Sequence, residues 1–417
     1  MVKNILILIT SIIGLLSNIY AQENICNCQK DLEYVFTHIQ KTPSFKDQFK
    51  GKEKDRFEKA YFSIQSSVKE STTVYHCFFL LVTLLESIKD NHIYLRGNTN
   101  SFTLKEVNDL SFIENYRKSR EFRIIPGISN NLDSLETELA NKHLDSIEGI
   151  YFYKDYFKIG IFETSKKDSL IGVVLKTSIQ SWDPGQVILQ LNKKDQSLFQ
   201  IITGKFIDKS LFHLVDYYTN GKLIQLGWTK DSSGVNYYQK GLSEKTFDLI
   251  ALNSNTQYLK LGSFNSFGTN LKEADEFYDQ IRDQLTSSNM IVDLRGNTGG
   301  GDRVSAKFFK LLKKYSATNK IYILINYTTM SNAEQFTVKL KKLDHVLLLG
   351  MRTNGTISYG RNKPNTLVLP SKEFKIRLTD LDNSKYMKYE EVGIKPDIEL
   401  EHHVDWIDQT VQIINKI

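Results

Sequence analysis

The sequence contains little proline, little cysteine and no strong charge bias. Six prolines and three cysteines in 417 residues exclude collagen-like repeats, Pro-rich stalks and a fold that depends on many disulfides. Lys and Arg number 54 against 48 Asp and Glu, and this small excess does not give the concentrated basic face that nucleic-acid binding needs. The hydrophobic (41%) and charged (24%) fractions are typical of a globular chain, whose length allows about two to four domains. We therefore expect a globular protein that does not bind nucleic acid.

The motifs that usually indicate a bound metal or cofactor are missing as well. The sequence has no His-Glu-x-x-His segment and no paired-cysteine spacing typical of zinc sites. Its glycine-rich segment at 296–301 matches neither of the two common phosphate-binding patterns. We therefore predict no metal and no cofactor.

The N-terminus has the pattern of a secretory signal. Lys3 precedes an apolar run from Ile5 to Leu16, and the stretch closes on Tyr20 and Ala21 before polar residues begin. This run is shorter than the roughly 20 residues that span a bilayer. We predict that residues 1–21 are removed, that the protein is exported to a periplasmic or extracellular location, and that no transmembrane segment remains.

All three cysteines lie in the mature chain. An exported protein meets an oxidising environment, which favours one disulfide. Cys26 and Cys28 are too close in sequence to pair comfortably. We expect Cys77 to pair with one of these two cysteines.

Three regions follow the signal. Residues 22–125 carry apolar residues at helical spacing and predict a helical region, in which His92 precedes a short strand. Residues 140–245 contain six or more short β-branched and aromatic runs, which predict an inserted antiparallel β-barrel or sandwich domain. Residues 246–417 alternate strand and helix, which predicts an α/β domain with parallel strands and right-handed crossovers.

Loops at the carboxyl ends of the parallel strands are expected to converge. The first, 295–302, is rich in glycine and opens a helix, so its N–H groups could approach a ligand, although a tight structural turn would give the same pattern. The second places Ser331 between a buried strand and a helix, where serine is also a favoured helix cap. Together the two loops could supply a nucleophile and an oxyanion hole.

Four motifs in the last third occur in a familiar order. They are Asp-Leu-Arg-Gly-Asn-x-Gly-Gly at 293–300, Ser-x-Ala-Glu at 331–334, Gly-x-x-Thr-x-Gly at 350–355 and Gly-Ile-x-Pro-Asp at 393–397. In this order and spacing they resemble the tail-specific (C-terminal processing) peptidases and the tricorn core protease, over roughly residues 246–400. The resemblance implies a ββα-spiral, ClpP/crotonase-like catalytic domain. It also implies a serine-type endopeptidase or carboxy-terminal processing peptidase that hydrolyses peptides or unfolded proteins.

The resemblance also implies roles for single residues. The processing peptidases use a lysine as base directly after the glycine of the third motif, but here that position is Thr356. The tricorn-like branch uses a histidine held by a relay to a glutamate. By this similarity Ser331 is the nucleophile, His92 the base and Glu390 the relay carboxylate, with Asn91 in the place of the relay serine.

The remaining expectations concern the oxyanion and the alternatives. The N–H groups of Gly299 and Asn332 are expected to hold the oxyanion, and Glu391 is the second choice for the carboxylate. The missing lysine and relay serine also allow a catalytically inactive protein that binds an apolar ligand or peptide on the same scaffold.

Overall fold

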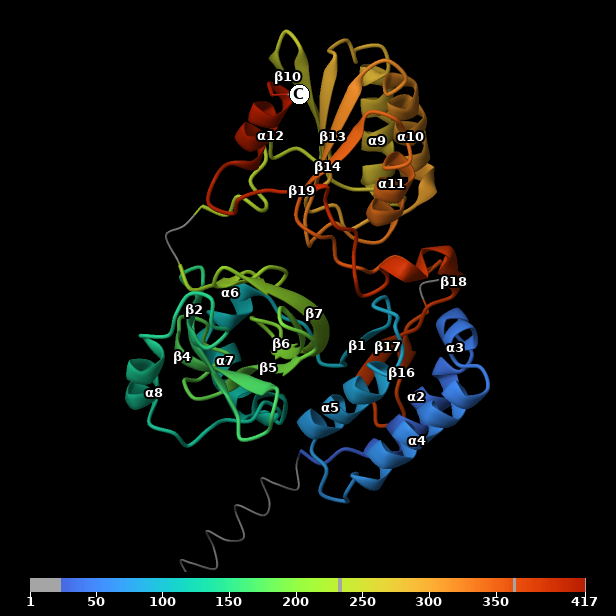
Figure 1. The fold of residues 1–417 in the computed structure, drawn as a ribbon. Coiled ribbons are helices and arrows are strands. Elements are labelled where there is room, and N and C mark those ends of the chain that lie inside the picture. Colours follow the sequence, from blue (N-terminus) through green and yellow to red (C-terminus); the bar gives the residue numbers. More distant parts are fainter. Residues whose placement is uncertain (1–23, 232–234, 363–364, 417) are drawn as a thin grey trace, which may run out of the picture. The chain divides into compact units, whose positions relative to one another are not determined.

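Residues 24–231, 235–362 and 365–416 are described by a computed structural model (Figure 1). The chain folds into two units. The first comprises the described residues of Met1–Lys89, Ile93–Ser232 and Arg361–Asp380, and the second those of Asp90–His92, Ser233–Gly360 and Leu381–Ile417. The predicted signal at 1–21 lies outside the described residues. Within the described ranges, no helix has both the length and the apolar character required to cross a membrane.

The first unit begins with the predicted helical region. Threonine side chains cap three of its helices, since Thr42, Thr73 and Thr103 accept hydrogen bonds from the N–H groups of Phe45, His76 and Glu106. A disulfide between Cys28 and Cys77 joins α2 (Cys28–Ile39) to α5 (Val74–Leu85). This confirms that Cys77 pairs with one of Cys26 and Cys28. The helices are α2 (Cys28–Ile39), α3 (Pro43–Gln48), α4 (Lys52–Ser66), α5 (Val74–Leu85), α6 (Leu104–Val107), α7 (Leu110–Lys118), η1 (Glu121–Arg123) and α8 (Leu132–Leu139).

A closed antiparallel barrel forms the rest of this unit and confirms the predicted β-rich architecture. Its eight strands follow the order β7-β6-β5-β4-β3-β2-β9-β8, and the pairing of β8 with β7 closes it. Closure leaves no free edge between these strands. The strands are β2 (Gly149–Tyr153), β3 (Phe157–Glu163), β4 (Ser169–Thr177), β5 (Val187–Lys193), β6 (Leu198–Gly204), β7 (Leu211–Thr219), β8 (Lys222–Leu223) and β9 (Trp228–Thr229).

Three further strands extend the sheet of the barrel. β1 (Tyr94–Gly97) pairs with β7 and, on its other side, with β17 (Phe374–Arg377), which pairs with β16 (Leu367–Val368). A segment from the last part of the sequence therefore completes the first unit.

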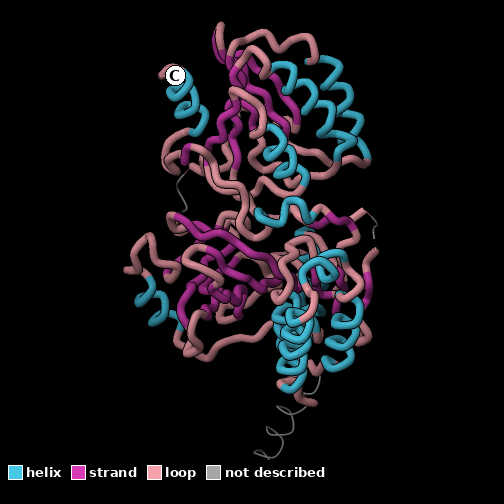
Figure 2. The backbone as a smooth tube through the Cα atoms, turned by 45° about the vertical axis from the view of Figure 1, so that its right-hand side comes forward, coloured by secondary structure: helices cyan, strands magenta, loops and turns pink. Residues whose placement is uncertain are grey.

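The second unit has the predicted α/β architecture. Its sheet has the order β10-β11-β12-β13-β14-β19, in which only β10 and β11 are antiparallel. Helices α9, α10 and α11 lie on one face and α12 on the other, as Figures 1 and 2 both show. The strands are β10 (Phe247–Asn253), β11 (Thr256–Leu261), β12 (Asn289–Asp293), β13 (Lys320–Ile325), β14 (Val346–Gly350) and β19 (Ile398–Glu399), and the helices are α9 (Gly268–Ile281), α10 (Asp302–Tyr315), α11 (Asn332–Leu340) and α12 (Trp406–Ile414).

The second unit also contains smaller elements. β15 (Tyr359–Gly360) and β18 (Leu381–Asp382) form an antiparallel pair, and η2 (Ser384–Tyr389) follows. The central strands β11 to β14 are almost entirely buried and rich in Ile, Leu and Val. This matches the near-continuous apolar runs expected of parallel strands covered on both faces.

Backbone hydrogen bonds bring the three strand-end loops together. The Met330 N–H donates to the Asn297 carbonyl at 3.0 Å, and the Ser331 N–H donates to the Thr356 carbonyl at 2.8 Å. The loops after β12, β13 and β14 thus meet at the carboxyl edge of the sheet, where open α/β folds place their ligands.

Candidate active site

Ser331 occupies a sharp turn between β13 and α11. Its φ is +57° and its ψ −123°, a backbone conformation that costs a non-glycine residue about 1–3 kcal/mol. The turn persists because the Ser331 N–H is held by the Thr356 carbonyl and by Glu334 Oε2, at 2.8 and 2.9 Å. The side chain is half-buried, so the hydroxyl is held in one place and is still accessible.

His92 lies against this hydroxyl. Its Nε2 is 2.9 Å from Ser331 Oγ, although the two residues are 239 positions apart in the sequence. The segment Asp90–His92 belongs to the second unit, whereas the residues on either side of it belong to the first. The His92 N–H donates to Asp90 Oδ1 at 3.1 Å, which fixes the backbone of the segment. The distance between imidazole and hydroxyl is within the range of a nucleophile and its general base.

Glu390 contacts the segment Asp90–His92 and is 2% exposed. Its Oε1 accepts the Asn91 N–H at 3.0 Å, and its Oε2 accepts the N–H groups of Ile357 and Ser358 at 2.9 and 2.7 Å. The Asn91 side-chain amide donates to the Gly355 carbonyl at 3.1 Å. Burial raises the pKa of Glu390 to about 7, although the three N–H groups oppose this by favouring the carboxylate. These bonds connect Glu390 to the histidine segment through the backbone of Asn91.

Glu334 is a second buried carboxylate, for which the sequence suggested no role. Its Oε1 accepts the Thr353 hydroxyl and the Gly355 N–H at 2.6 and 2.8 Å, and its Oε2 accepts the N–H groups of Ser331 and Thr356 at 2.9 and 3.0 Å. Burial raises its pKa to about 7. Glu334 therefore joins the serine turn to the loop after β14. Its place three residues after Ser331, the spacing of a capping box, was the signal that could have identified it.

The glycine loop packs directly against the serine turn. Gly299 has φ +92°, and a Cβ atom there would lie 2.8 Å from Ser331 Cβ and 2.8 Å from Asn332 N. The Gly299 N–H donates to Asn297 Oδ1 at 2.9 Å. Among the described residues, the N–H groups of Gly300 and Asn332 have no hydrogen-bond partner. Asn297 also donates to the Leu261 carbonyl at 2.8 Å, so it fixes the loop from within, a role that the sequence did not suggest.

A buried ion pair supports the beginning of this loop. Arg295 donates to both carboxylate oxygens of Asp293, at 2.9 and 2.6 Å, and the Tyr258 hydroxyl donates to Asp293 Oδ2 at 2.7 Å. Both charged side chains are almost fully buried. A buried pair with these additional hydrogen bonds fixes geometry more than it adds stability, as expected for residues that brace the loop.

The position directly after Gly355, where the processing peptidases carry a lysine base, is not occupied by a lysine here. Thr356 occupies that position, and its hydroxyl donates to Asn354 Oδ1. Of the nearby lysines 339, 341 and 342, the first two are engaged elsewhere, Lys339 with Asp302 at 3.2 Å and Lys341 with Asp397 at 2.6 Å.

The structure brings the six predicted site residues into one network. The bonds described above join His92 to Ser331, Asn91 to Glu390, and the 297–299 loop to the serine turn. The nucleophilic, basic and N–H groups needed for acyl transfer thus lie within one set of loops of the second unit.

Residues 305–400 match peptidase family S41. No curated protein matches the sequence. Solved structures that match the chain include mature CPAF (11% identity, covering 95% of this chain and 97% of that one, TM-score 0.44), the photosystem II D1 C-terminal processing protease (12%, 91% and 95%, 0.37) and the tricorn protease (15%, 93% and 37%, 0.43). The matched segment contains Ser331, Glu334 and Glu390. The match over residues 305–400 supports the predicted resemblance to the tail-specific serine peptidases.

Proposed function

We propose that the protein is an exported serine peptidase in which Ser331 attacks the peptide carbonyl and His92 is the general base. The observation that carries the proposal is the 2.9 Å contact between Ser331 Oγ and His92 Nε2. For His92 to act as the base, Nε2 must accept the hydroxyl proton, and the neutral imidazole then carries its own proton on Nδ1. As the serine oxygen bonds to the carbonyl carbon, this proton passes to His92, which returns it to the leaving amine. Water then releases the acyl group by the same route.

The oxyanion is held by backbone N–H groups at the mouth of the turn. The Asn332 N–H has no competing partner among the described residues. A second donor comes from the neighbouring glycine loop: either Gly299, after it exchanges its bond to Asn297, or Gly300, whose N–H is without a partner in the described structure. The N–H groups of Asn332 and Gly300 can bind the oxyanion without breaking a hydrogen bond, whereas Gly299 must first release Asn297.

Glu390 and Asn91 act as positioning residues. Glu390 binds the Asn91 N–H, and the Asn91 amide binds the Gly355 carbonyl. Both bonds hold the backbone directly before His92, and so they set the direction from which the imidazole reaches Ser331. The expected relay between carboxylate and imidazole is therefore replaced, in this proposal, by main-chain support.

The first test is hydrolysis of a peptide library by the purified chain. Ser331→Ala should lower kcat/KM by at least about 10³-fold, as removal of a nucleophile does in other serine peptidases. Ser288→Ala, which changes an exposed serine of the same unit, should leave it unchanged. Mass spectrometry of the products separates cleavage within a chain from removal of carboxy-terminal residues. Binding of a peptide or an apolar ligand without any turnover would refute the proposal and favour a binding protein.

A further inference from the structure

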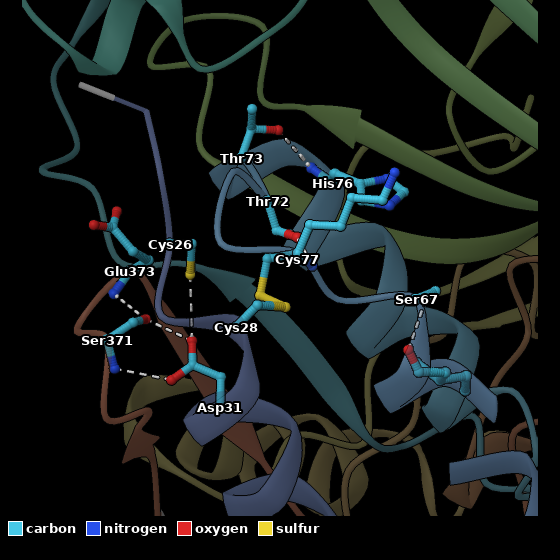
Figure 3. Close-up of a disulfide and its surroundings, with 12 residues drawn as sticks. Cys26, Cys28, Asp31, Ser67, Thr72, Thr73, His76, Cys77, Ser371 and Glu373 are labelled. Atoms are coloured by element: carbon cyan, nitrogen blue, oxygen red, sulfur yellow. Dashed lines mark hydrogen bonds between the residues drawn. A yellow bond between two sulfur atoms is a disulfide. The ribbon is translucent and has the colours of Figure 1, made fainter. Parts of the chain in front are cut away.

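Three cysteines and an aspartate form a buried cluster in the first unit. Cys28, at the start of α2, is bridged to Cys77 in α5, and Cys26 is a buried free thiol two residues before Cys28. Asp31, one turn into α2, is 0% exposed. Figure 3 shows the Cys26 thiol directed at the Asp31 carboxylate, beside the disulfide. The peptidase mechanism uses none of these four residues.

The donor atoms are close enough to surround one ion. Cys26 Sγ, Cys77 Sγ and a carboxylate oxygen of Asp31 lie within 4.8 Å of one another, and Cys26 Sγ is 3.7 Å from Asp31 Oδ2. In a tetrahedral zinc site, Zn–S and Zn–O bonds of about 2.3 and 2.1 Å place neighbouring ligand atoms roughly 3.5–3.8 Å apart. The cluster therefore needs only a small contraction, and Cys28 supplies a fourth ligand once its sulfur is released from Cys77.

The surroundings of Asp31 resemble the support that metal ligands receive. The Ser371 N–H donates to Asp31 Oδ1 at 2.8 Å, and the Ser371 hydroxyl donates to Oδ2 at 2.5 Å. Outer hydrogen bonds of this kind orient a carboxylate ligand and tune its affinity. Glu373, the other acid nearby, is paired with Arg120 at 2.7 Å, so it adds little uncompensated negative charge.

Cys26 is a buried free thiol that donates a hydrogen bond to Asp31 Oδ2. A divalent metal displaces a thiol proton and compensates the negative charge that a buried thiolate and carboxylate carry together.

We propose that Cys26, Cys28, Cys77 and Asp31 bind Zn²⁺, or a comparably thiophilic divalent metal, when the Cys28–Cys77 disulfide is reduced. A phosphine and one water convert the disulfide into two thiols and a phosphine oxide. The metal then replaces the protons of the three thiols, which pass to solvent, and Asp31 completes a tetrahedral site. Disulfide and metal are thus alternative ways of joining α2 to α5. This inference does not depend on the proposed peptidase mechanism.

The probe is Co²⁺, whose thiolate complexes absorb visibly, added to the full chain purified under a phosphine reductant. The reduced protein should bind one equivalent with thiolate-to-cobalt charge-transfer absorption, and Zn²⁺ should displace it. The oxidised protein, with the same sequence, should show no such absorption. Cys26→Ala and Asp31→Asn should each weaken binding at least about tenfold.

The variants can be checked for folding independently of the metal. Cys26→Ala retains both cysteines of the bridge, so its oxidised form should have the circular dichroism spectrum of the wild type. The proposal is overturned if the reduced wild type binds no cobalt, if oxidised and reduced protein bind it equally, or if Cys26→Ala binds with unchanged affinity.

Discussion

Replacement of Gly299 by alanine should damage catalysis more than the same change three residues earlier. Gly299 and Gly296 belong to one loop and both have positive φ, +92° and +76°. A Cβ at 299 would lie 2.8 Å from each of Asn332 N, Met330 O and Ser331 Cβ, whereas a Cβ at 296 would meet nothing within 4 Å. The two substitutions therefore share the backbone cost and differ in the steric one.

The expected magnitudes follow from these contacts. Positive φ costs alanine about 1–2 kcal/mol at either position. Overpacking adds about 1–3 kcal/mol at position 299, giving about 2–5 kcal/mol in total, which a domain of ordinary stability survives. Because the clash falls on the serine turn itself, Ser331 or Asn332 must shift by several tenths of an ångström. A displacement of that order can cost about 10²-fold in rate.

Urea unfolding and peptide hydrolysis measure the two effects separately. Gly296→Ala should lose stability only, with kcat within a few-fold of the wild type. Gly299→Ala should lose more stability and about 10²-fold in kcat. Equal kcat values for the two variants would refute the argument that the glycine loop sets the position of the serine turn.

Three further outcomes are expected. Burial lowers the pKa of His213 from 6.5 to about 4. Because the unfolded state then binds more protons than the folded state, the free energy of unfolding should fall by up to about 3 kcal/mol as pH drops from 6.5 to 4. In acid-unfolding curves, His213→Gln should remove this dependence. Glu390→Gln should lower kcat about tenfold or more, with KM little changed, because it weakens the hydrogen bond from the Asn91 N–H. Glu391→Gln should leave kcat unchanged. The reverse result would assign the positioning role to Glu391. Since burial raises the pKa of Glu334 to about 7, its carboxylate protonates as pH falls through 7 and then accepts fewer hydrogen bonds from the serine turn. Glu334→Gln should therefore lower kcat at every pH. A variant as active as the wild type would contradict this.

Local patterns were sufficient to predict most of the architecture. Helical spacing identified the N-terminal helices, short β-branched runs identified the barrel, and buried apolar strands identified the parallel sheet. The pairing of β1 with β17, residues 94–97 with 374–377, was beyond such patterns. Periodicity shows that a segment is a strand and which of its faces is buried, but it does not specify a distant partner. For the same reason the sequence left open which cysteine pairs with Cys77.

The site was predictable to the extent that motifs carry it. Ser331, His92 and Glu390 came from the resemblance, and their proximity is a matter of tertiary structure. Glu334 and Asn297 belong to the motifs, but the motifs do not show what these side chains bind, because their hydrogen bonds go to backbone groups of other loops. It also placed Asn91 in a side-chain relay, whereas the backbone N–H of Asn91 is the group that meets Glu390. A main-chain role such as that of Asn91 places no requirement on the side chain, so a motif does not show it.

The central claim is that His92 activates Ser331, and covalent labelling tests it most directly. A serine-directed phosphonate, followed by peptide mapping, should modify one residue per chain, Ser331. His92→Ala should slow this labelling by at least about 10²-fold, the contribution expected of a general base, while His143→Ala, which changes a histidine whose side chain is 80% exposed, should not. Labelling of a different residue, or of Ser331 at the wild-type rate in His92→Ala, would contradict the account.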